Sequence, residues 1–348
     1  MSMMRWARIL VMATITLAAV AGVAQQPVVD HAQVTTHSGE RGLAPELEIV
    51  KRGGSTAWVG WSIPVQGGFS SGWDSDRTVM LEGEGHYSDN GDHKQSKRFD
   101  HAMILMRVTG GGVEKLHVEQ PDRQLDAGGL SFVWLNSVAP EDSVRTLAAM
   151  AKQNATKKLR DNLVFAISIH ETPVATEALT GLASAGNDLE IREKAAFWLA
   201  NQRGPEGFKV IQRLAQKDED AQFREKLTFD LTLVKDPAPA ALNELIRMAH
   251  EDSAPQVRKQ AQFWMATKGG KQVAGDLRSQ AENDPNEQVR KEAVFALSRL
   301  PEPEATTQLI QLTSSNKDAV VRKQAVFWLG QSHDPKALEY LTKLLQQP

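Results

Sequence analysis

The chain has 348 residues, of which 41% are hydrophobic and 24% are charged, with a formal net charge of −3 and no cysteine. This is the composition of a globular protein, long enough for more than one hydrophobic core and too polar for a protein that crosses a membrane many times. The lack of cysteine excludes disulfides, thiolate catalysis and metal centres held by cysteine. The small negative net charge argues against nucleic acid as a partner, because nucleic-acid binding normally uses a strongly basic surface.

The first 24 residues have the pattern of a secretory signal peptide. Arg5 and Arg8 form a positive start, an apolar run follows over 9–20, and Gly22 and Ala24 are the small residues expected before a cleavage site. An apolar helix of that length covers about 18 Å, less than the ~30 Å hydrocarbon core of a bilayer. We predict cleavage after Ala24, a periplasmic or secreted mature protein, and no stable membrane insertion after cleavage. An uncleaved membrane anchor is the alternative.

A period close to 32 residues runs through the C-terminal part of the chain. Around a recurring arginine, apolar residues occupy positions −1, +3 and +7, which form one stripe on a helix. Each unit therefore predicts two helices, and such a short pair buries its apolar stripes only by stacking on its neighbours, as in an α-solenoid. The arginines are spaced by 32, 32, 34, 32 and 32 residues and are Arg160, Arg192, Arg224, Arg258, Arg290 and Arg322.

The repeated motif resembles a known family. The last unit reads Val-Arg-Lys-Gln-Ala-Val-Phe-Trp-Leu over 321–329, followed by Gly330-Gln331 and His333-Asp334-Pro335. It resembles the short HEAT-like repeats of phycobilisome lyases, over about residues 140–348. We expect 139–348 to form an all-α, right-handed superhelix of about six helical hairpins with a leading and a closing helix. No single activity is implied, since such repeats occur in scaffolds, receptors and a few enzymes.

The N-terminal half has a different pattern. Residues 25–45 lack periodicity and are expected to be a linker, and 46–138 are expected to form an antiparallel β module. Strands are predicted at 57–65, 78–82, 101–108, 113–119 and 130–135, with a hairpin turn at Gly110–Gly112. The module resembles the front part of bacterial envelope proteins that carry HEAT-like repeats. The predicted fold class is thus α+β and multidomain, an antiparallel β module followed by the solenoid.

Phenylalanine occupies position +5 in all six units. At about 100° per residue, this position lies roughly 160° from the apolar stripe. The rings either form a row along the concave groove, where solenoids usually bind partners, or pack between successive repeats together with tryptophans at +6. Strictly repeated large apolar residues are usually structural, although such rings can still line the groove in part. The candidate partner-binding residues are Phe197, Phe229, Phe263, Phe295 and Phe327, with Lys259, Lys291 and Lys323 at +1.

Charged residues keep the same period. An ion-pair ladder between repeats explains the arginines better than anion binding, because acidic partners recur in step with them at Asp188, Asp220, Asp252, Asp284 and Asp318. At position +1, acidic residues in the early units give way to lysines in the late ones. Such a gradient would orient an extended ligand, although mixed charge also serves solubility.

Two groups in the β module are candidate binding sites. Trp58, Trp61 and Trp73 could form a platform for a sugar, but Trp58 and Trp61 are three residues apart and face opposite sides of one strand, which favours core packing. A polar stretch lacks the EF-hand pattern and is interpreted as an exposed loop rather than a calcium or zinc site. Its possible ligands are Asp74, Asp76, His86, Asp89, Asp92, His93 and His101.

Enzymatic motifs are weak. The pairs His170-Glu171 and His250-Glu251 resemble those of a HEAT-like di-iron hydroxylase, but they lie on different helices of their units and cannot face each other across a metal. We therefore predict a non-enzymatic scaffold of the cell envelope, without catalytic residues, metal or cofactor, that binds a protein or peptide on its concave face. The alternative is a β module that binds carbohydrate or another envelope polymer, with the solenoid as a spacer. A metal-dependent enzyme is the third possibility.

Overall fold

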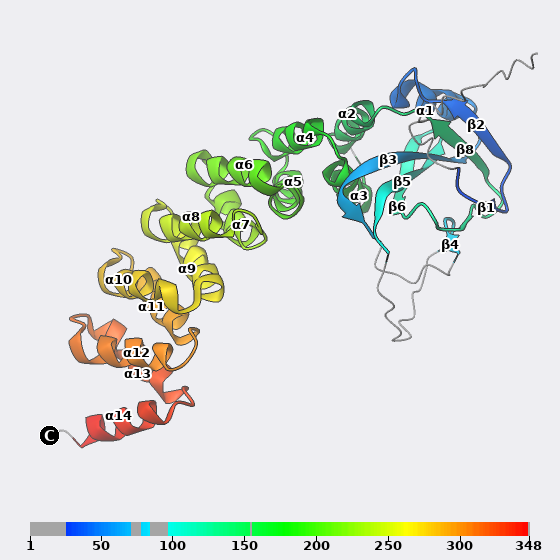
Figure 1. The fold of residues 1–348 in the computed structure, drawn as a ribbon. Helices are drawn as coiled ribbons and strands as arrows, with labels where there is room; N and C mark the ends of the chain where they lie inside the picture. Colours follow the sequence, from blue (N-terminus) through cyan, green and yellow to red (C-terminus); the bar gives the residue numbers. More distant parts are fainter. Residues whose placement is uncertain (1–25, 71–77, 84–96, 154, 347–348) are drawn as a thin grey trace, which may run out of the picture.

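The computed structural model describes residues 26–70, 78–83, 97–153 and 155–346. A small β module at one end continues into a curved stack of helices that finishes at α14 (Figure 1). The predicted signal peptide, Trp73 and most of the polar stretch from Asp74 to His93 lie outside the described residues. In the part that is described, no helix combines the length and apolar character needed to cross a bilayer.

The predicted array of helical hairpins is confirmed. Each first helix of a pair is followed by a second helix that carries the repeated arginine, and α14 (Pro335–Leu345) follows the last pair. The first helices are α2 (Pro140–Ala151), α4 (Pro173–Ala183), α6 (Gly204–Lys217), α8 (Ala238–Glu251), α10 (Ala274–Asn283) and α12 (Glu304–Ser315). The second helices are α3 (Lys157–Ile169), α5 (Leu189–Gln202), α7 (Ala221–Leu231), α9 (Pro255–Gly269), α11 (Glu287–Ser298) and α13 (Ala319–Gly330), and a 3-10 turn, η1 (Gly270–Val273), joins α9 to α10.

The apolar stripe determines how the second helices pack. In α9, Val257, Ala261 and Met265 occupy positions −1, +3 and +7, and all three are fully buried. Neighbouring second helices pack more closely than neighbouring first helices. This difference bends the stack, so the second helices lie along its inner side (Figure 1). We call the surface formed by α3, α5, α7, α9, α11 and α13 the inner face.

The β module contains two sheets rather than one. The larger sheet has the order β2-β8-β3-β5-β6, and the smaller has the order β1-β7-β4. The strands are β1 (Val29–Asp30), β2 (Val34–Ser38), β3 (Ala57–Phe69), β4 (Val79–Met80), β5 (Phe99–Thr109), β6 (Gly112–Glu119), β7 (Leu125–Asp126) and β8 (Ser131–Asn136).

The prediction of an antiparallel module is wrong for part of the larger sheet. The β3–β5 and β5–β6 pairs are antiparallel, with the predicted hairpin turn between β5 and β6, but β8 runs parallel to both β2 and β3. After the hairpin, the chain passes through β7 in the smaller sheet before it returns beside β3. A long connection of this kind permits parallel pairing, and the strand pattern alone does not reveal where the returning strand inserts.

The prediction of a linker over 25–45 is also wrong. β2 pairs with β8 along its whole length, from Val34 opposite Phe132 to Ser38 opposite Asn136, and the helix α1 (Leu43–Arg52) begins before residue 45. β1 pairs with β7 in the smaller sheet. β2 is a largely exposed edge strand and therefore lacks the alternation of apolar residues that marks a strand in the sequence, and β1 has only two residues.

The larger sheet separates two hydrophobic cores. Trp58 lies on the face covered by the smaller sheet, with Leu81 and Leu125. Trp61 lies on the opposite face and belongs to the core that continues into the helices. Both indoles are fully buried, as predicted from their spacing, so neither is available as part of a sugar platform.

A buried hydrogen-bond chain joins the β module to the first helical pairs. The indole N–H of Trp61 donates to the Ser143 hydroxyl at 3.0 Å, and Ser143 lies 2.9 Å from Nε2 of His170. Nδ1 of His170 donates to the Ala166 carbonyl at 2.7 Å. Because Nδ1 carries the proton, neutral Nε2 accepts a hydrogen bond from the Ser143 hydroxyl, and every polar side-chain atom in this hydrogen-bond chain has a partner. The joint therefore depends on a neutral imidazole.

Acid should weaken this joint. Burial, helped by the charge of Arg203, lowers the pKa of His170 from 6.5 to about 4. The unfolded chain then binds the extra proton first, so the contribution of His170 to the free energy of unfolding should fall by roughly 3 kcal/mol as the pH drops from 6.5 to 4. Buried carboxyls with raised pKa values, such as Glu119, act in the opposite direction over this range, so the contribution of His170 is measured as a difference between variants. Urea unfolding followed by circular dichroism at pH 7 and pH 4.5 should show that His170→Asn retains more of its stability at the lower pH than the wild type does, whereas the exposed His333→Asn should match the wild type; equal effects of the two variants would contradict this assignment.

Candidate partner-binding face

The repeated arginines connect successive hairpins. In the central repeats, the arginine of one second helix donates two hydrogen bonds to the aspartate that precedes the next second helix. Arg224 donates to Asp252 at 2.8 and 2.9 Å, and Arg258 donates to Asp284 at the same distances. Each arginine also donates to a carbonyl of its own loop; for Arg258 this is the Asp252 carbonyl, at 2.8 Å. One guanidinium thus fixes both the start of its own helix and the distance to the next second helix.

The ladder is weaker at its ends. Arg160 lies 3.9 Å from Asp188 and 3.7 Å from Glu190, whereas Arg192 bonds chiefly to Asp218, at 2.5 Å, and lies 3.4 Å from Asp220. Arg290 reaches Asp318 at 2.9 Å. Arg322, in the last pair, donates to the carbonyls of Asn316 and Lys317, and no carboxylate pairs with it within the described residues.

The phenylalanines at +5 form a row on the inner face. Phe197, Phe229, Phe263 and Phe295 are half-buried, and Phe327 is 54% exposed. The rings therefore do two things. They pack against aromatic neighbours at the seams between second helices, and they keep one edge accessible on the inner face. We call these five side chains, with Phe165, the aromatic row.

Tryptophan at +6 completes the row in every second repeat. Phe165 contacts Trp198 with ring centroids 4.9 Å apart, and the equivalent pairs Phe229–Trp264 and Phe295–Trp328 lie at 5.1 and 5.0 Å. Each tryptophan also meets the phenylalanine of its own helix edge to face, as Trp264 does with Phe263 at 4.9 Å. Such pairs bring neighbouring helices together through rings rather than aliphatic side chains.

One residue at +6 is charged and was missed in the sequence. Asp230 occupies in α7 the position that Trp198 holds in α5 and Trp264 holds in α9. Its side chain is fully buried, and neither carboxylate oxygen has a hydrogen-bond partner. Burial raises the pKa of Asp230 to about 8, the negative charge of Glu193 adds to this effect, and Lys226 opposes it. Aligning the six units by their arginines would have revealed this acidic residue at a position that is otherwise alanine or tryptophan.

A cavity of about 460 Å³ opens on the inner face across α5, α7 and α9. Its wall contains two carboxylates, one ammonium group, amides and two rings of the aromatic row. The residues that line it are Glu193, Gln222, Glu225, Lys226, Phe229, Gln260 and Trp264.

The predicted rim lysines differ in their surroundings. Lys259 is half-buried and acts electrostatically on Glu292, whose pKa is raised by burial. Lys291 pairs with Glu287 of its own helix at 2.7 Å, whereas Lys323 is exposed. In the acidic part of the face, Asp161 pairs with Lys194 of the next helix at 3.2 Å. Charges on neighbouring second helices therefore partly neutralise one another.

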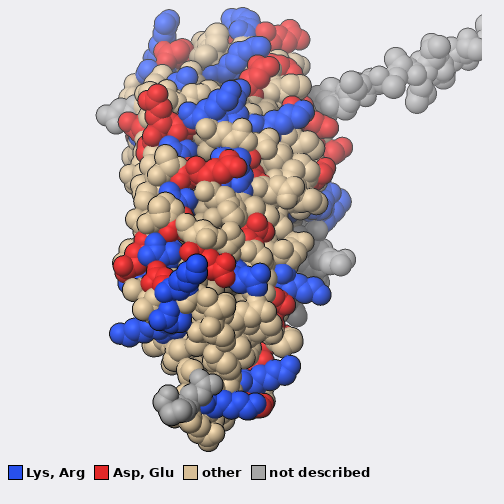
Figure 2. Space-filling view, turned by 90° about the vertical axis from the view of Figure 1, so that its left-hand side faces the viewer, with Lys and Arg blue, Asp and Glu red and all other residues tan. Residues whose placement is uncertain are grey.

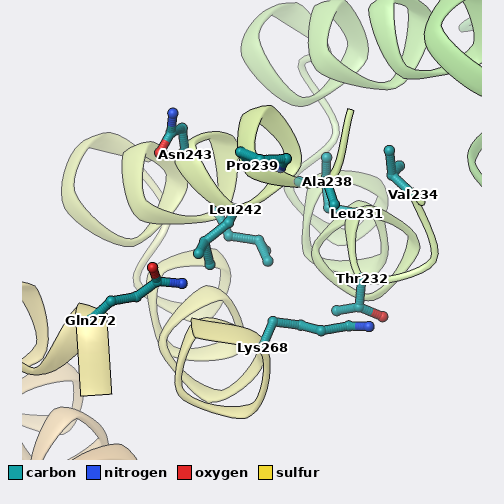
Figure 3. A pocket seen from close by; sticks show the side chains of 10 residues that line it. Leu231, Thr232, Val234, Ala238, Pro239, Leu242, Asn243, Lys268 and Gln272 are labelled. Carbon is teal, nitrogen blue, oxygen red and sulfur yellow. The ribbon is translucent and has the colours of Figure 1, made fainter. Parts of the chain in front are cut away.

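The outer side of the stack has fewer features of a binding site than the inner face. Acidic and basic side chains are interspersed over the face formed by the first helices (Figure 2). A cavity of about 330 Å³ lies at the edge of the stack between α7, α8 and α9. Leu242 and Pro239 reach it from α8, and Lys268 is the one charged residue that lines it (Figure 3). This largely apolar notch has no pair of functional groups that could perform chemistry.

The two His-Glu pairs lie apart in the structure. His170 is buried in the joint to the β module, and His250, near the end of α8, contacts Gln280 at 2.6 Å. Among the described residues, no three histidine, aspartate or glutamate side chains are arranged to hold a metal ion.

Comparison with known proteins relates the last part of the chain to HEAT repeats. A family model of HEAT repeats matches residues 275–348, which confirms the resemblance for that part of the chain. No curated protein matches the sequence.

Several solved structures are similar to part of the chain. Human deoxyhypusine hydroxylase is 16% identical, with a TM-score of 0.33 over 60% of this chain and 80% of that one. The CpcE–CpcF phycocyanin lyase of Nostoc sp. PCC7120 is 18% identical, with a TM-score of 0.29 over 59% and 80%. Kap121p is 14% identical, with a TM-score of 0.39 over 58% of this chain and 26% of its own.

The ladder predicts unequal costs for equivalent substitutions. Arg258→Ala should lower the free energy of unfolding by about 3 kcal/mol or more, because Asp284 would remain buried without its partner. Arg322→Ala, at the terminal position, should cost only about 1 kcal/mol, since that side chain bonds to carbonyls alone. Urea unfolding measures both. The double variant Arg258→Ala/Asp284→Ala should be more stable than Arg258→Ala. Equal losses in the free energy of unfolding at Arg258 and Arg322 would contradict a stabilising role for the ion pairs.

Proposed function

We propose that the protein is a non-enzymatic scaffold that holds an extended segment of a partner protein along its inner face. The aromatic row carries this proposal. Half-buried rings recur at a fixed spacing along one surface, and accessible aromatic side chains are typical of protein interfaces. The binding needs no cofactor, because packing and charge supply the contacts.

Charge would give the bound segment a direction. The +1 positions of the inner face change from Asp161, Glu193 and Glu225 in the early pairs to Lys259, Lys291 and Lys323 in the late pairs. A segment with basic residues at one end and acidic residues at the other would fit this order, and complementary charge favours one orientation over its reverse.

Carbohydrate or polymer binding by the β module has less support. Trp58 and Trp61 are buried on opposite faces of the sheet, so they present no common surface to a sugar. The module instead shares a core with the first helices, which suits a cap that covers the first repeat.

We propose in addition that the protein acts in the periplasm or outside the cell. The pattern over residues 1–24 supports this location, and the lack of cysteine makes the chain indifferent to an oxidising environment.

Site-specific photocrosslinking tests the proposed binding face. We expect p-benzoylphenylalanine at Phe229, Lys259 or Phe327 to form an adduct with the same partner in native cells, because all three lie on the inner face. The same photoreactive residue at Arg213 in α6 or Gln311 in α12, which are exposed on first helices, should give none. Adducts from the first helices without any from the inner face would contradict the proposed function.

The proposed location predicts a defined mature chain. Intact mass spectrometry of protein recovered from native cells should give a chain that begins at Gln25, released into the periplasmic or extracellular fraction. A chain that retains Arg5 and Arg8 and sediments with membranes would contradict cleavage.

A further inference from the structure

The aromatic row is interrupted at one place. Where Ala296 replaces a tryptophan at +6, Phe263 and Phe295 close the gap by stacking at 6.5 Å. Between α5 and α7, by contrast, the described residues include no ring contact from Phe197 to the next helix, and Asp230 occupies the position at +6. The interruption therefore combines a missing ring with a carboxyl group.

The carboxyl of Asp230 lies at this seam without a partner. Other buried aspartates of the array are neutralised: Asp252 and Asp284 each accept two hydrogen bonds from an arginine. Asp230 is equally buried, and both of its oxygens are unsatisfied. An unpaired buried carboxyl destabilises a fold. Asp230 therefore marks the seam between α5 and α7 as a place where packing does not explain the residue.

The chemistry of the neighbouring cavity indicates what that partner is. Glu193 and Lys226, the two charged residues that act on Asp230, both line the cavity across α5, α7 and α9, and Glu225 adds a further carboxylate. The ammonium of Lys226 lies 5.3 Å from the centroid of the Phe229 ring. The wall thus already holds a cation against an aromatic face, and Lys226 is exposed and free to move aside.

We propose that the segment bound on the inner face carries an arginine or lysine side chain that enters this cavity. Its cationic group stacks on Phe229 and Trp264 and is neutralised by Glu193 and Glu225, the two carboxylates of the cavity wall. This inference rests on the proposed function and specifies the chemistry of the partner at the point where the aromatic row is broken.

We call this cavity, with Glu193, Glu225, Phe229 and Trp264 in its wall, the cation pocket. Fluorescence anisotropy with matched peptides tests it. The probes are fluorescein-labelled decapeptides of Gly and Ser with two arginines, and the same peptides with citrulline or glutamate in place of arginine. Citrulline keeps the shape of arginine and removes its charge. The full-length mature protein should bind the arginine peptide at least about tenfold more tightly than the citrulline peptide, and the glutamate peptide should bind weakest.

Variants then locate the site. Glu193→Gln/Glu225→Gln should reduce the affinity for the arginine peptide at least about fivefold, whereas Glu219→Gln, an exposed change off the inner face, should not. A thermal midpoint of the double variant equal to that of the wild type would show that lost binding does not reflect unfolding.

The result that overturns the proposal is distinct from failure of the scaffold function. Equal affinity for the arginine and citrulline peptides, no binding of the arginine peptide, or wild-type affinity in the Glu193→Gln/Glu225→Gln variant would eliminate the cation pocket. The crosslinking experiment on the inner face judges the scaffold function independently, and adducts there would stand even if the pocket did not.

Discussion

Close contact between neighbouring second helices is the constraint on which the rest of the structure depends. A small residue at +3, such as Ala261, lets the helices approach, and the arginine at position zero fixes the distance by bonding to the aspartate of the next repeat. Because the first helices pack less closely, the stack must curve toward the second helices. The inner face is therefore a consequence of this packing and is continuous over the whole array.

The ion-pair ladder and the aromatic row stabilise different parts of each second helix. Arg–Asp pairs hold the N-terminal ends, and rings at +5 and +6 fill the seams further along. Rings at a seam both pack and remain partly accessible, so one set of residues stabilises the array and lines its binding surface. Asp230 is the exception, since it adds no stability where its neighbours do. Residues that break a local rule without a structural gain are typical of functional sites.

The sequence predicted what repeats along the chain. The arginine period, the buried stripe and the aspartates in step with it are local patterns, so the hairpins and the second-helix seams followed directly. The opposite placement of Trp58 and Trp61 followed from strand geometry. The parallel insertion of β8 and the pairing of β2 did not, because both depend on contacts between distant segments. The burial of Asp230 also escaped prediction, since it depends on how α7 registers against α5.

The most direct test of the account is 19F NMR of the mature protein labelled with 5-fluorotryptophan, titrated with the partner recovered by photocrosslinking. The inner-face account predicts that the resonances of Trp198, Trp264 and Trp328 shift on binding, while those of Trp58, Trp61 and Trp134 in the β module stay unchanged. Shifts confined to the β-module tryptophans, with the three inner-face resonances unmoved, would contradict it.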